Sequence, residues 1–331
     1  MAFHFAFFNV PWERRRQMAC LLFWAMLLPW CVSLAFGSLF NPLAWPLYIP
    51  YLVYIVFNRT PTQGSRGWSW LRKLKFWQYC ADYFPVKLVV EDTLDPAHNY
   101  VFGYHPHGII SVGAFLNFAT EATHISKLLP GLNLRLLTLT INFYIPFYRE
   151  FLLGMNVASV SRNSIDYILN SGPGQSCVIV VGGASESLYA KPGQADLVLR
   201  KRLGFIKLAI KHGAKLVPCF TFGENDIYDQ VNPGSGALLR SIQRKIQSYC
   251  GFTTPLFHGR GVFNYDLGLM PFRVPLVTVV GRPVSVRQNA NPTLEEILQV
   301  QERYMVELQR IYTKYKDVYA KNRVSDLCFV E

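Results

Sequence analysis

Apolar and polar positions divide the chain into an N-terminal apolar segment and a longer part in which short apolar runs alternate with mixed segments. The segment Gln17–Asn58 contains no charged residue, and its 42 positions are enough for two membrane spans of about 20 residues each. Asn41 and Pro42, near its middle, are turn-forming residues. The pattern therefore predicts two helices, Met18–Phe36 and Leu43–Phe57, joined by a tight turn.

Basic residues flank both ends of this apolar segment. They are Arg14, Arg15 and Arg16 before it, and Arg59, Arg66, Arg72, Lys73 and Lys75 after it. Because positively charged flanks stay in the cytosol, we predict a transmembrane hairpin over residues 17–58 with both termini cytosolic. The segment is too long for a cleaved signal peptide. Pro29, Pro46 and Pro50 weaken strict helicity and leave a single tilted or re-entrant helix open.

A basic, tryptophan-rich segment follows. Its apolar positions at helical spacing are Trp68, Leu71, Leu74 and Trp77, with basic side chains between them. Such a helix suits the membrane interface, and packing against a protein core is the alternative. The chain is therefore divided into a cytosolic N-terminus (1–16), the hairpin (17–58), an interfacial amphipathic linker (59–98) and a globular domain (99–331).

Short runs rich in Val, Ile and Phe, without strict alternation, fill the globular domain, as is typical of strands buried on both faces. The strand candidates are Tyr100–Tyr104, Leu134–Leu139, Cys177–Val181, Lys215–Phe222 and Leu276–Val280. Segments with helical patterns lie between them and end at Gly172 and Gly213. This alternation predicts an α/β fold with a largely parallel sheet and flanking helices. In such sheets ligands bind at the carboxyl ends of strands, where "HPHG", "GGASES" and "FGEN" stand.

A long helix is predicted near the C-terminus, from Thr293 to Asn322. Its apolar stripe consists of Ile297, Tyr304, Leu308, Ile311 and Tyr315. We expect this stripe to pack against the core of the domain, rather than against a coiled-coil partner.

Composition narrows the functional class. The chain has 331 residues and a net charge of +12, yet only 16% of its residues are charged and 51% are hydrophobic. These values indicate a membrane-associated protein, and the basic balance then points to a lipid surface or a phosphate-bearing substrate, not to nucleic acid. Seven cysteines without a C-x-x-C pair make a zinc site or a disulfide framework unexpected and favour a reducing compartment.

Two histidines close together at a strand end are the strongest chemical signal. His105 and His107 flank Pro106 and are followed by Gly108. A neutral imidazole can accept a proton near neutral pH, and Gly108 can turn its amide towards a developing oxyanion. A buried pair with a purely structural role is the alternative. Two histidines without further ligands at supporting spacing do not predict a metal site.

Several other catalytic motifs are absent. "GGASES" lacks the second glycine that a nucleophile elbow requires, which disfavours a serine hydrolase. Neither a dinucleotide fingerprint nor a phosphate-binding P-loop occurs.

An ordered set of motifs carries a family resemblance. These motifs are "DYFPVKL", "YHPHG", "NFATEAT", "VVGGASESL", "GFIKLAIKHGAKLVPCFTFGEND" and "PLFHGRGVFNYDLGLMPF". Together they resemble the type-2 diacylglycerol acyltransferases, a family that includes monoacylglycerol and wax-ester acyltransferases, and most of all the enzymes of oil-storing fungi. The resemblance implies acyl transfer from acyl-CoA to diacylglycerol, with no cofactor, in the endoplasmic reticulum membrane and at lipid droplets.

The resemblance also implies roles for individual residues. His105 is the implied base, with His107 as the alternative, and the amides of Gly108, Gly182 and Gly183 are candidate oxyanion donors. The related glycerol-phosphate acyltransferases carry an Asp five residues after the histidine, but here Ile110 and Val112 stand at those positions. The motif therefore does not give the carboxylate that orients the imidazole. The candidates are Glu186, Glu224 and Glu121, and Glu186 is ranked first because "GGASES" stands where the related enzymes carry their second motif. Implied substrate-binding residues are Tyr83, Phe84, Pro85, Gly182, Gly183, Arg202, Glu224, Asn225 and Arg260.

Some questions stay open at this level. The acceptor can be diacylglycerol, monoacylglycerol or a long-chain alcohol, and a catalytically inactive membrane scaffold is the alternative from another functional class. The sequence does not fix the oligomeric state and is compatible with a homo-oligomer.

Overall fold

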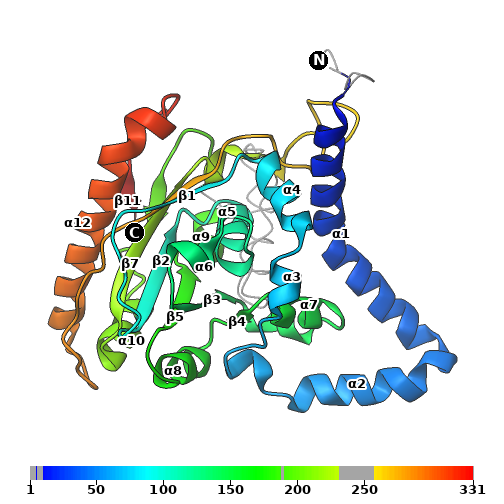
Figure 1. Ribbon diagram of the computed structural model, residues 1–331, viewed down its shortest axis with the longest axis horizontal. Coiled ribbons are helices and arrows are strands. Elements are labelled where there is room, and N and C mark those ends of the chain that lie inside the picture. Colours follow the sequence, from blue (N-terminus) through cyan, green and yellow to red (C-terminus); the bar gives the residue numbers. More distant parts are fainter. Residues whose placement is uncertain (1–4, 6–9, 188–189, 231–256, 331) are drawn as a thin grey trace, which may run out of the picture.

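The computed structural model describes residue 5 and residues 10–187, 190–230 and 257–330. A twisted sheet occupies the middle of the molecule (Figure 1). Helix α12 (Leu294–Tyr319) lies along one side of this sheet, and helices α1 (Trp12–Phe40), α2 (Trp45–Phe57), α3 (Ser69–Arg72) and α4 (Lys75–Tyr83) lie on the other side.

The central sheet has seven strands in the order β1-β10-β7-β2-β5-β3-β4. Their bounds are β1 Lys87–Val90, β2 Tyr100–His105, β3 Asn133–Thr138, β4 Val157–Ser159, β5 Gln175–Val180, β7 Lys215–Phe222 and β10 Val277–Val280. All neighbouring pairs are parallel except β10 with β7. The predicted α/β fold with a largely parallel sheet is confirmed. All five predicted strands are present, whereas the short strands β1 and β4 were not foreseen.

Strand β2 shows why these apolar runs do not alternate with polar residues. All six of its residues are buried. Tyr100, Phe102 and Tyr104 point into one core cluster, and Val101 points into the cluster on the opposite face. Because helices cover both faces of the sheet, polar side chains in this strand would be taken out of water on either side.

Shorter elements connect the strands. The remaining helical segments are η1 (Pro42–Ala44), η2 (Thr60–Thr62), α5 (Val112–Ala114), η3 (Phe115–Ala119), α6 (Ile125–Leu128), η4 (Thr140–Tyr144), α7 (Tyr148–Gly154), α8 (Arg162–Asn170), α9 (Gly183–Ser187), α10 (Gly204–His212) and η5 (Glu224–Asp226). Two small sheets pair β6 (Asp196–Val198) with β11 (Cys328–Val330), and β8 (Asp229–Gln230) with β9 (Phe257–His258).

The predicted long helix is confirmed as α12. Thr293 and Glu296 form a capping box at its start, in which each side chain accepts a hydrogen bond from the other residue's backbone N–H. The predicted stripe faces the core: Tyr304, Leu308 and Ile311 are fully buried. Helix α12 therefore covers one face of the sheet and carries Tyr304 into it.

In the described part of the chain, α1 is the helix that is long and apolar enough to cross a membrane. It has 29 residues, and an 18-residue window within it has a mean hydropathy of 2.0 while only 11% of that window is buried. Its amino-terminal half packs on α4, where the rings of Trp24 and Trp77 are 5.9 Å apart. Its carboxyl-terminal half exposes large apolar side chains, including Phe36 and Phe40. Length and composition therefore suit α1 to a membrane.

Helix α2 differs from the predicted second span. The turn lies at Asn41–Pro42, as predicted, but α2 has 13 residues, about 20 Å at 1.5 Å per residue. This is shorter than the roughly 30 Å hydrocarbon core of a bilayer. In Figure 1, α2 runs back towards the domain at a wide angle to α1 instead of lying along it. Among the described residues, the predicted hairpin segment thus forms one long apolar helix and a short second one, not an antiparallel pair of spanning helices.

The predicted amphipathic linker helix is broken into two parts. Leu74, between α3 and α4, has an extended backbone (ψ 136°). Trp77 is buried and donates its ring N–H to the carbonyl of Leu71, whereas Trp70 is 64% exposed. The linker therefore packs partly against the domain and leaves only some of its aromatic side chains at the surface.

Candidate active site

Three neighbouring strands bring the three polar motifs together. Strand β2 lies between β7 and β5 and is parallel to both. "HPHG" follows β2, "GGASES" follows β5 and "FGEN" follows β7. Since parallel strands present their carboxyl ends at the same edge, the motifs meet there as the sequence indicates.

His105, the last residue of β2, is fully buried and is held by Tyr304. Its Nε2 lies 2.9 Å from the hydroxyl oxygen of Tyr304, which also donates to the carbonyl of Gly103 at 3.1 Å. A carbonyl can only accept, so the single hydroxyl proton goes to Gly103, and Nε2–H of His105 donates to the tyrosine oxygen. Nδ1 then carries the lone pair, and it has no hydrogen-bond partner among the described residues.

Burial lowers the pKa of His105 to about 3. A buried imidazolium without a carboxylate beside it is costly, so the ring is neutral across the physiological pH range. His105 therefore has the protonation state and the tautomer of a base that accepts a proton at Nδ1.

Gly103 makes this arrangement possible. A Cβ atom built at Gly103 would lie 2.0 Å from the hydroxyl oxygen of Tyr304. A glycine inside a buried strand marks a place where another group approaches the backbone closely. Here that group is the tyrosine that contacts His105.

His107 lies on the following loop and is half-buried. Its Nδ1 is 3.0 Å from the carbonyl oxygen of Gly108, which requires Nδ1 to be the protonated nitrogen and leaves Nε2 as the acceptor. Burial lowers the pKa of His107 as well. Both imidazoles are thus neutral and each presents one nitrogen lone pair, so either ring has the state that a general base needs.

Glu186 supports the backbone of this loop. One carboxylate oxygen accepts the N–H of His107 at 2.5 Å, and the other accepts the N–H of Val198 at 2.9 Å. Burial raises the pKa of Glu186 to about 7. The resemblance implied that this carboxylate orients the catalytic imidazole. The structure instead places it on backbone groups, and the hydroxyl of Tyr304 occupies the position next to the ring of His105.

Glu224 is a second buried carboxyl group beside the loop. One oxygen accepts from the hydroxyl of Tyr104 at 2.6 Å and from the N–H of Gly113 at 3.0 Å. Its other oxygen has no hydrogen-bond partner in the described part of the chain, and burial raises the pKa of Glu224 to about 7. Gly108 (φ +60°) passes so close that a Cβ there would lie 2.8 Å from Cγ of Glu224. Glu224 therefore packs directly under the histidine loop.

Other candidates take up different positions around this edge. Glu121 pairs with Arg72 at 3.2 Å, which satisfies that carboxylate outside the loop. Arg202 donates to the carbonyl of Gly182 at 3.1 Å, so it stands beside the loop after β5. Gly183 (φ +59°) faces open space, with no atom within 4 Å of a built Cβ.

Four of the predicted substrate-binding residues lie together, away from the histidine loop. They are Tyr83, Phe84, Pro85 and Arg260. Tyr83 is fully buried and donates its hydroxyl to the carbonyl of Pro271 at 2.7 Å, while Phe84 beside it is also fully buried. Pro85 follows at the end of the same turn. The guanidinium of Arg260 stacks on Tyr265 at 4.5 Å. Burial raises the pKa of Tyr83, and the nearby charge of Arg260 opposes this effect in part. These residues belong to the packing between α4 and the segment before β10.

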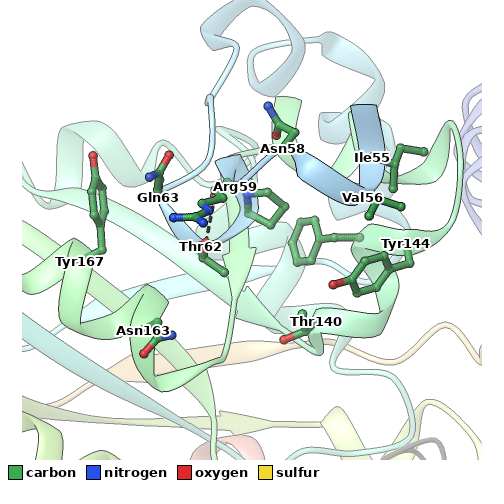
Figure 2. Close-up of a pocket in the computed structure, with 12 residues that line it drawn as sticks. Ile55, Val56, Asn58, Arg59, Thr62, Gln63, Thr140, Tyr144, Asn163 and Tyr167 are labelled. Atoms are coloured by element: carbon green, nitrogen blue, oxygen red, sulfur yellow. Dashed lines mark hydrogen bonds between the residues drawn. The ribbon is translucent and has the colours of Figure 1, made fainter. Parts of the chain in front are cut away.

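Two of the cavities in the described part of the molecule bear on the location of the site. One, of about 570 Å³, is lined by Pro106 of the histidine loop and by Asn225. The other, of about 560 Å³, lies under the carboxyl end of α2 and is shown in Figure 2. Its lining includes Ile55, Arg59 and Tyr144, but no residue of the three motifs. The candidate active site is therefore the edge of the sheet that adjoins the first cavity.

The described residues contain no group of three or more His, Cys, Asp or Glu side chains that could hold a metal ion. The chemistry available at this edge is thus that of two neutral imidazoles, two carboxyl groups with raised pKa values, and backbone amides at glycines. This set suits proton transfer from a hydroxyl and stabilisation of an oxyanion.

A protein-family sequence model described as "Diacylglycerol acyltransferase" matches residues 37–330 of the chain. The chain belongs to the diacylglycerol acyltransferase family.

Several members of the diacylglycerol acyltransferase family align with almost the whole length of this chain. Diacylglycerol O-acyltransferase 2B of Umbelopsis ramanniana is 50% identical, over 97% of this chain and 93% of that protein. Diacylglycerol O-acyltransferase 2 of Dictyostelium discoideum is 48% identical, over 96% and 97%. A 2-acylglycerol O-acyltransferase 1 of Bos taurus is 44% identical over the same shares.

For this family member, sequence reasoning found the three motifs but missed the role of Tyr304. The pattern of α12 placed Tyr304 in an apolar stripe and gave no sign that its hydroxyl ends on His105, 199 residues away. Gly103 was the available signal. A glycine in an otherwise aromatic and β-branched strand indicates a close approach, but it does not identify the approaching residue.

Proposed function

We propose that this protein is an acyl-CoA:diacylglycerol O-acyltransferase that makes triacylglycerol, with His105 as its general base. The observation that carries this proposal is the buried, neutral imidazole of His105 in a fixed tautomer, at the edge where the three family motifs meet. Family membership and the names of the relatives supply the reaction class.

The reaction needs only proton transfer and oxyanion stabilisation. Nδ1 of His105 takes the proton of the acceptor hydroxyl while the hydroxyl oxygen attacks the thioester carbonyl carbon. The tetrahedral intermediate collapses, the carbon–sulfur bond breaks, and the thiolate of CoA leaves. The imidazolium returns its proton to this thiolate, so the products are the ester and CoA. Because the thioester is already activated, acyl-CoA is a co-substrate and no further cofactor takes part.

Backbone amides are the proposed oxyanion donors. Those of Gly108, Gly182 and Gly183 lie on the two loops that flank the carboxyl end of β2. The open space beside Gly183 leaves room for a reacting carbonyl group. Glu186 acts as a positioning residue in this proposal, because its carboxylate holds the backbone N–H of His107 and thereby fixes the loop.

Membrane attachment is part of the proposal. The amino-terminal half of α1 packs on α4, and at the carboxyl end of α2 the guanidinium of Arg149 donates to the side-chain oxygen of Asn58 at 2.5 Å. Both ends of the α1–α2 segment are thus anchored on the same domain, which favours insertion of the apolar bend from the cytosolic side with both termini in the cytosol. We place the protein in the endoplasmic reticulum membrane and at lipid droplets, where diacylglycerol reaches the site from the bilayer.

Acyl transfer in membranes of a yeast strain without its own neutral-lipid acyltransferases tests the function. Labelled oleoyl-CoA is offered with diacylglycerol, monoacylglycerol or a fatty alcohol, to wild type and to the H105A and H107A variants. We expect triacylglycerol from wild type and a loss of at least 100-fold in H105A, in line with the contribution of a general base. Transfer to monoacylglycerol alone would assign the acceptor named in the bovine relative, 2-acylglycerol. Absence of any ester from well-expressed wild type would leave a membrane scaffold, and near-full activity of H105A would make His107 the base.

A further inference from the structure

The cavity beside the histidine loop is lined by both apolar and charged residues. Its volume is about 570 Å³, and Pro106, which follows His105 directly, lines it. Phe220, Phe222 and Tyr312 form an apolar wall. Residues after the end of α12, including Lys321, also line it, and Lys321 is exposed. The cavity therefore connects a charged rim to the residues next to the candidate base.

A buried amide group in this cavity lacks a partner. Asn225 is only 8% exposed, and its side-chain N–H donates to the carbonyl of Gln194 at 2.8 Å. Its side-chain oxygen Oδ1 is buried and has no hydrogen-bond partner among the described residues. A buried acceptor without a partner is costly, so its presence in a cavity wall indicates a ligand that brings a donor.

The rim is suited to an anion. Lys321 forms no ion pair with any residue that the structure describes, whereas its neighbour Arg323 pairs with Asp317 and Asp326 at 2.8 and 3.0 Å. The α12 wall also lies across the sheet from α1 and α2, as Figure 1 shows. A ligand that enters here comes from the side opposite the apolar helices, which suits a water-soluble substrate and not a glyceride.

We propose that this cavity binds the pantetheine arm of acyl-CoA, with Asn225 Oδ1 accepting one of its amide N–H groups and Lys321 contacting a phosphate at the rim. Pantetheine is a slender chain with two amides. It links a phosphorylated nucleotide to the thioester, so it matches a cavity whose lining combines Lys321, the unpaired acceptor of Asn225 and a residue next to His105. An acyl chain carries no N–H donor and no anion. This proposal rests on the proposed function and adds to it the route by which the acyl donor enters.

Two measurements on the full-length, detergent-solubilised protein test the site. The first is binding of a non-reactive thioether analogue of oleoyl-CoA, which needs no turnover. The second is the pair of KM values for oleoyl-CoA and diacylglycerol. For N225A we expect the Kd of the analogue and the KM for oleoyl-CoA to rise about tenfold, the effect of one lost hydrogen bond, with the KM for diacylglycerol unchanged.

Two further cavity variants, A320W and K321Q, test the site independently in case N225A does not fold. A320W places an indole in the cavity wall, and V306W, at a 64% exposed position of α12 outside the cavity, is its control. K321Q removes the rim cation, and K127Q, at an exposed position of α6, is its control. We expect A320W and K321Q to weaken analogue binding at least fivefold and the two controls to bind as wild type does.

The outcomes separate the two proposals. If wild type transfers acyl groups and all three cavity variants bind the analogue like wild type, the cavity is not the entry route. If wild type binds the analogue through Asn225 and Lys321 but transfers no acyl group, the proposed function fails and the binding site stands.

Discussion

The hydroxyl of Tyr304 lies 2.9 Å from Nε2 of His105 and joins the C-terminal helix to the candidate catalytic loop. The same hydroxyl donates to the carbonyl of Gly103, two residues before His105 on β2. The tautomer of the imidazole is therefore fixed by a residue whose own position depends on how α12 packs on the sheet. Positioning of the proposed base and packing of the domain are coupled through this contact.

Removal of the Tyr304 hydroxyl should affect turnover more than binding. In Y304F, the Nε2–H of His105 loses its acceptor, and the imidazole is free to change its tautomer and rotate. We expect kcat to fall about 10- to 100-fold, part of what a general base contributes, while both KM values stay within about twofold. Y315F, on the same helix, is the control. Equal kinetics in the two variants would show that Tyr304 serves packing alone.

Gly103 should tolerate no side chain. In G103A the new Cβ would lie 2.0 Å from the tyrosine oxygen, so either Tyr304 or β2 must shift. We expect loss of most activity together with a lower midpoint of thermal unfolding, measured by intrinsic fluorescence in detergent. G204A is the control, because no atom lies within 4 Å of a Cβ built there. Full activity of G103A would mean that the contact between Tyr304 and Gly103 is dispensable.

The sequence was sufficient for five of the seven strands of the central sheet and for the edge at which the three motifs meet. Long buried strands such as β7 have a continuous apolar pattern, so their bounds follow from composition alone, and the strand ends then locate the motifs. Strands β1 and β4, with four and three residues, are too short to give such a pattern. Their pairing depends on neighbours that are distant in the chain.

Contacts within the site could not be foreseen for a similar reason. Glu186 was expected to orient an imidazole, but its carboxylate accepts two backbone N–H groups, and backbone donors carry no signature in a sequence. The length of α2 could not be predicted either. An uncharged apolar stretch has the same sequence pattern whether it forms one long and one short helix or two equal spans. Only the packing of Tyr48 and Tyr51 of α2 on Phe147 distinguishes these arrangements.

Stability should depend on pH through Glu224. Its pKa is raised from the ordinary value of 4.5 to about 7, so between these values the folded protein retains a proton that the unfolded chain has lost. The contribution of this group to stability is therefore complete below about pH 4.5 and is lost as pH rises towards 7.

The variant E224Q mimics the protonated acid and has no proton to lose. The unfolding free energy of E224Q should increase relative to that of wild type by about 3 kcal/mol in total as pH rises from 4.5 to 7. Above pH 7 the difference between the two proteins should stay constant. The opposite pH dependence from His105, whose pKa is lowered, is present in both proteins and cancels in this difference. Denaturant titrations at pH 5, 6, 7 and 8 measure it. A difference that does not change with pH would mean that Glu224 is ionised in the folded protein.

The exposed apolar side chains of the α1–α2 segment should determine membrane retention. Leu43, Leu47 and Phe57 are 91%, 84% and 76% exposed, and burial in lipid of each such side chain is worth about 2 kcal/mol. Serine at all three positions removes this contribution without touching the site. We expect a large part of the protein to leave the membrane fraction on alkaline carbonate washing, while thermal stability in detergent is unchanged.

A matched control for this variant is L298S together with V306S, at exposed apolar positions of α12 on the opposite side of the sheet. Because these side chains face away from α1 and α2, the control protein should stay in the membrane fraction as wild type does. Equal release of both variants would point to a general loss of structure, and full retention of the triple serine variant would mean that α1, with its 29 residues, holds the protein in the bilayer on its own.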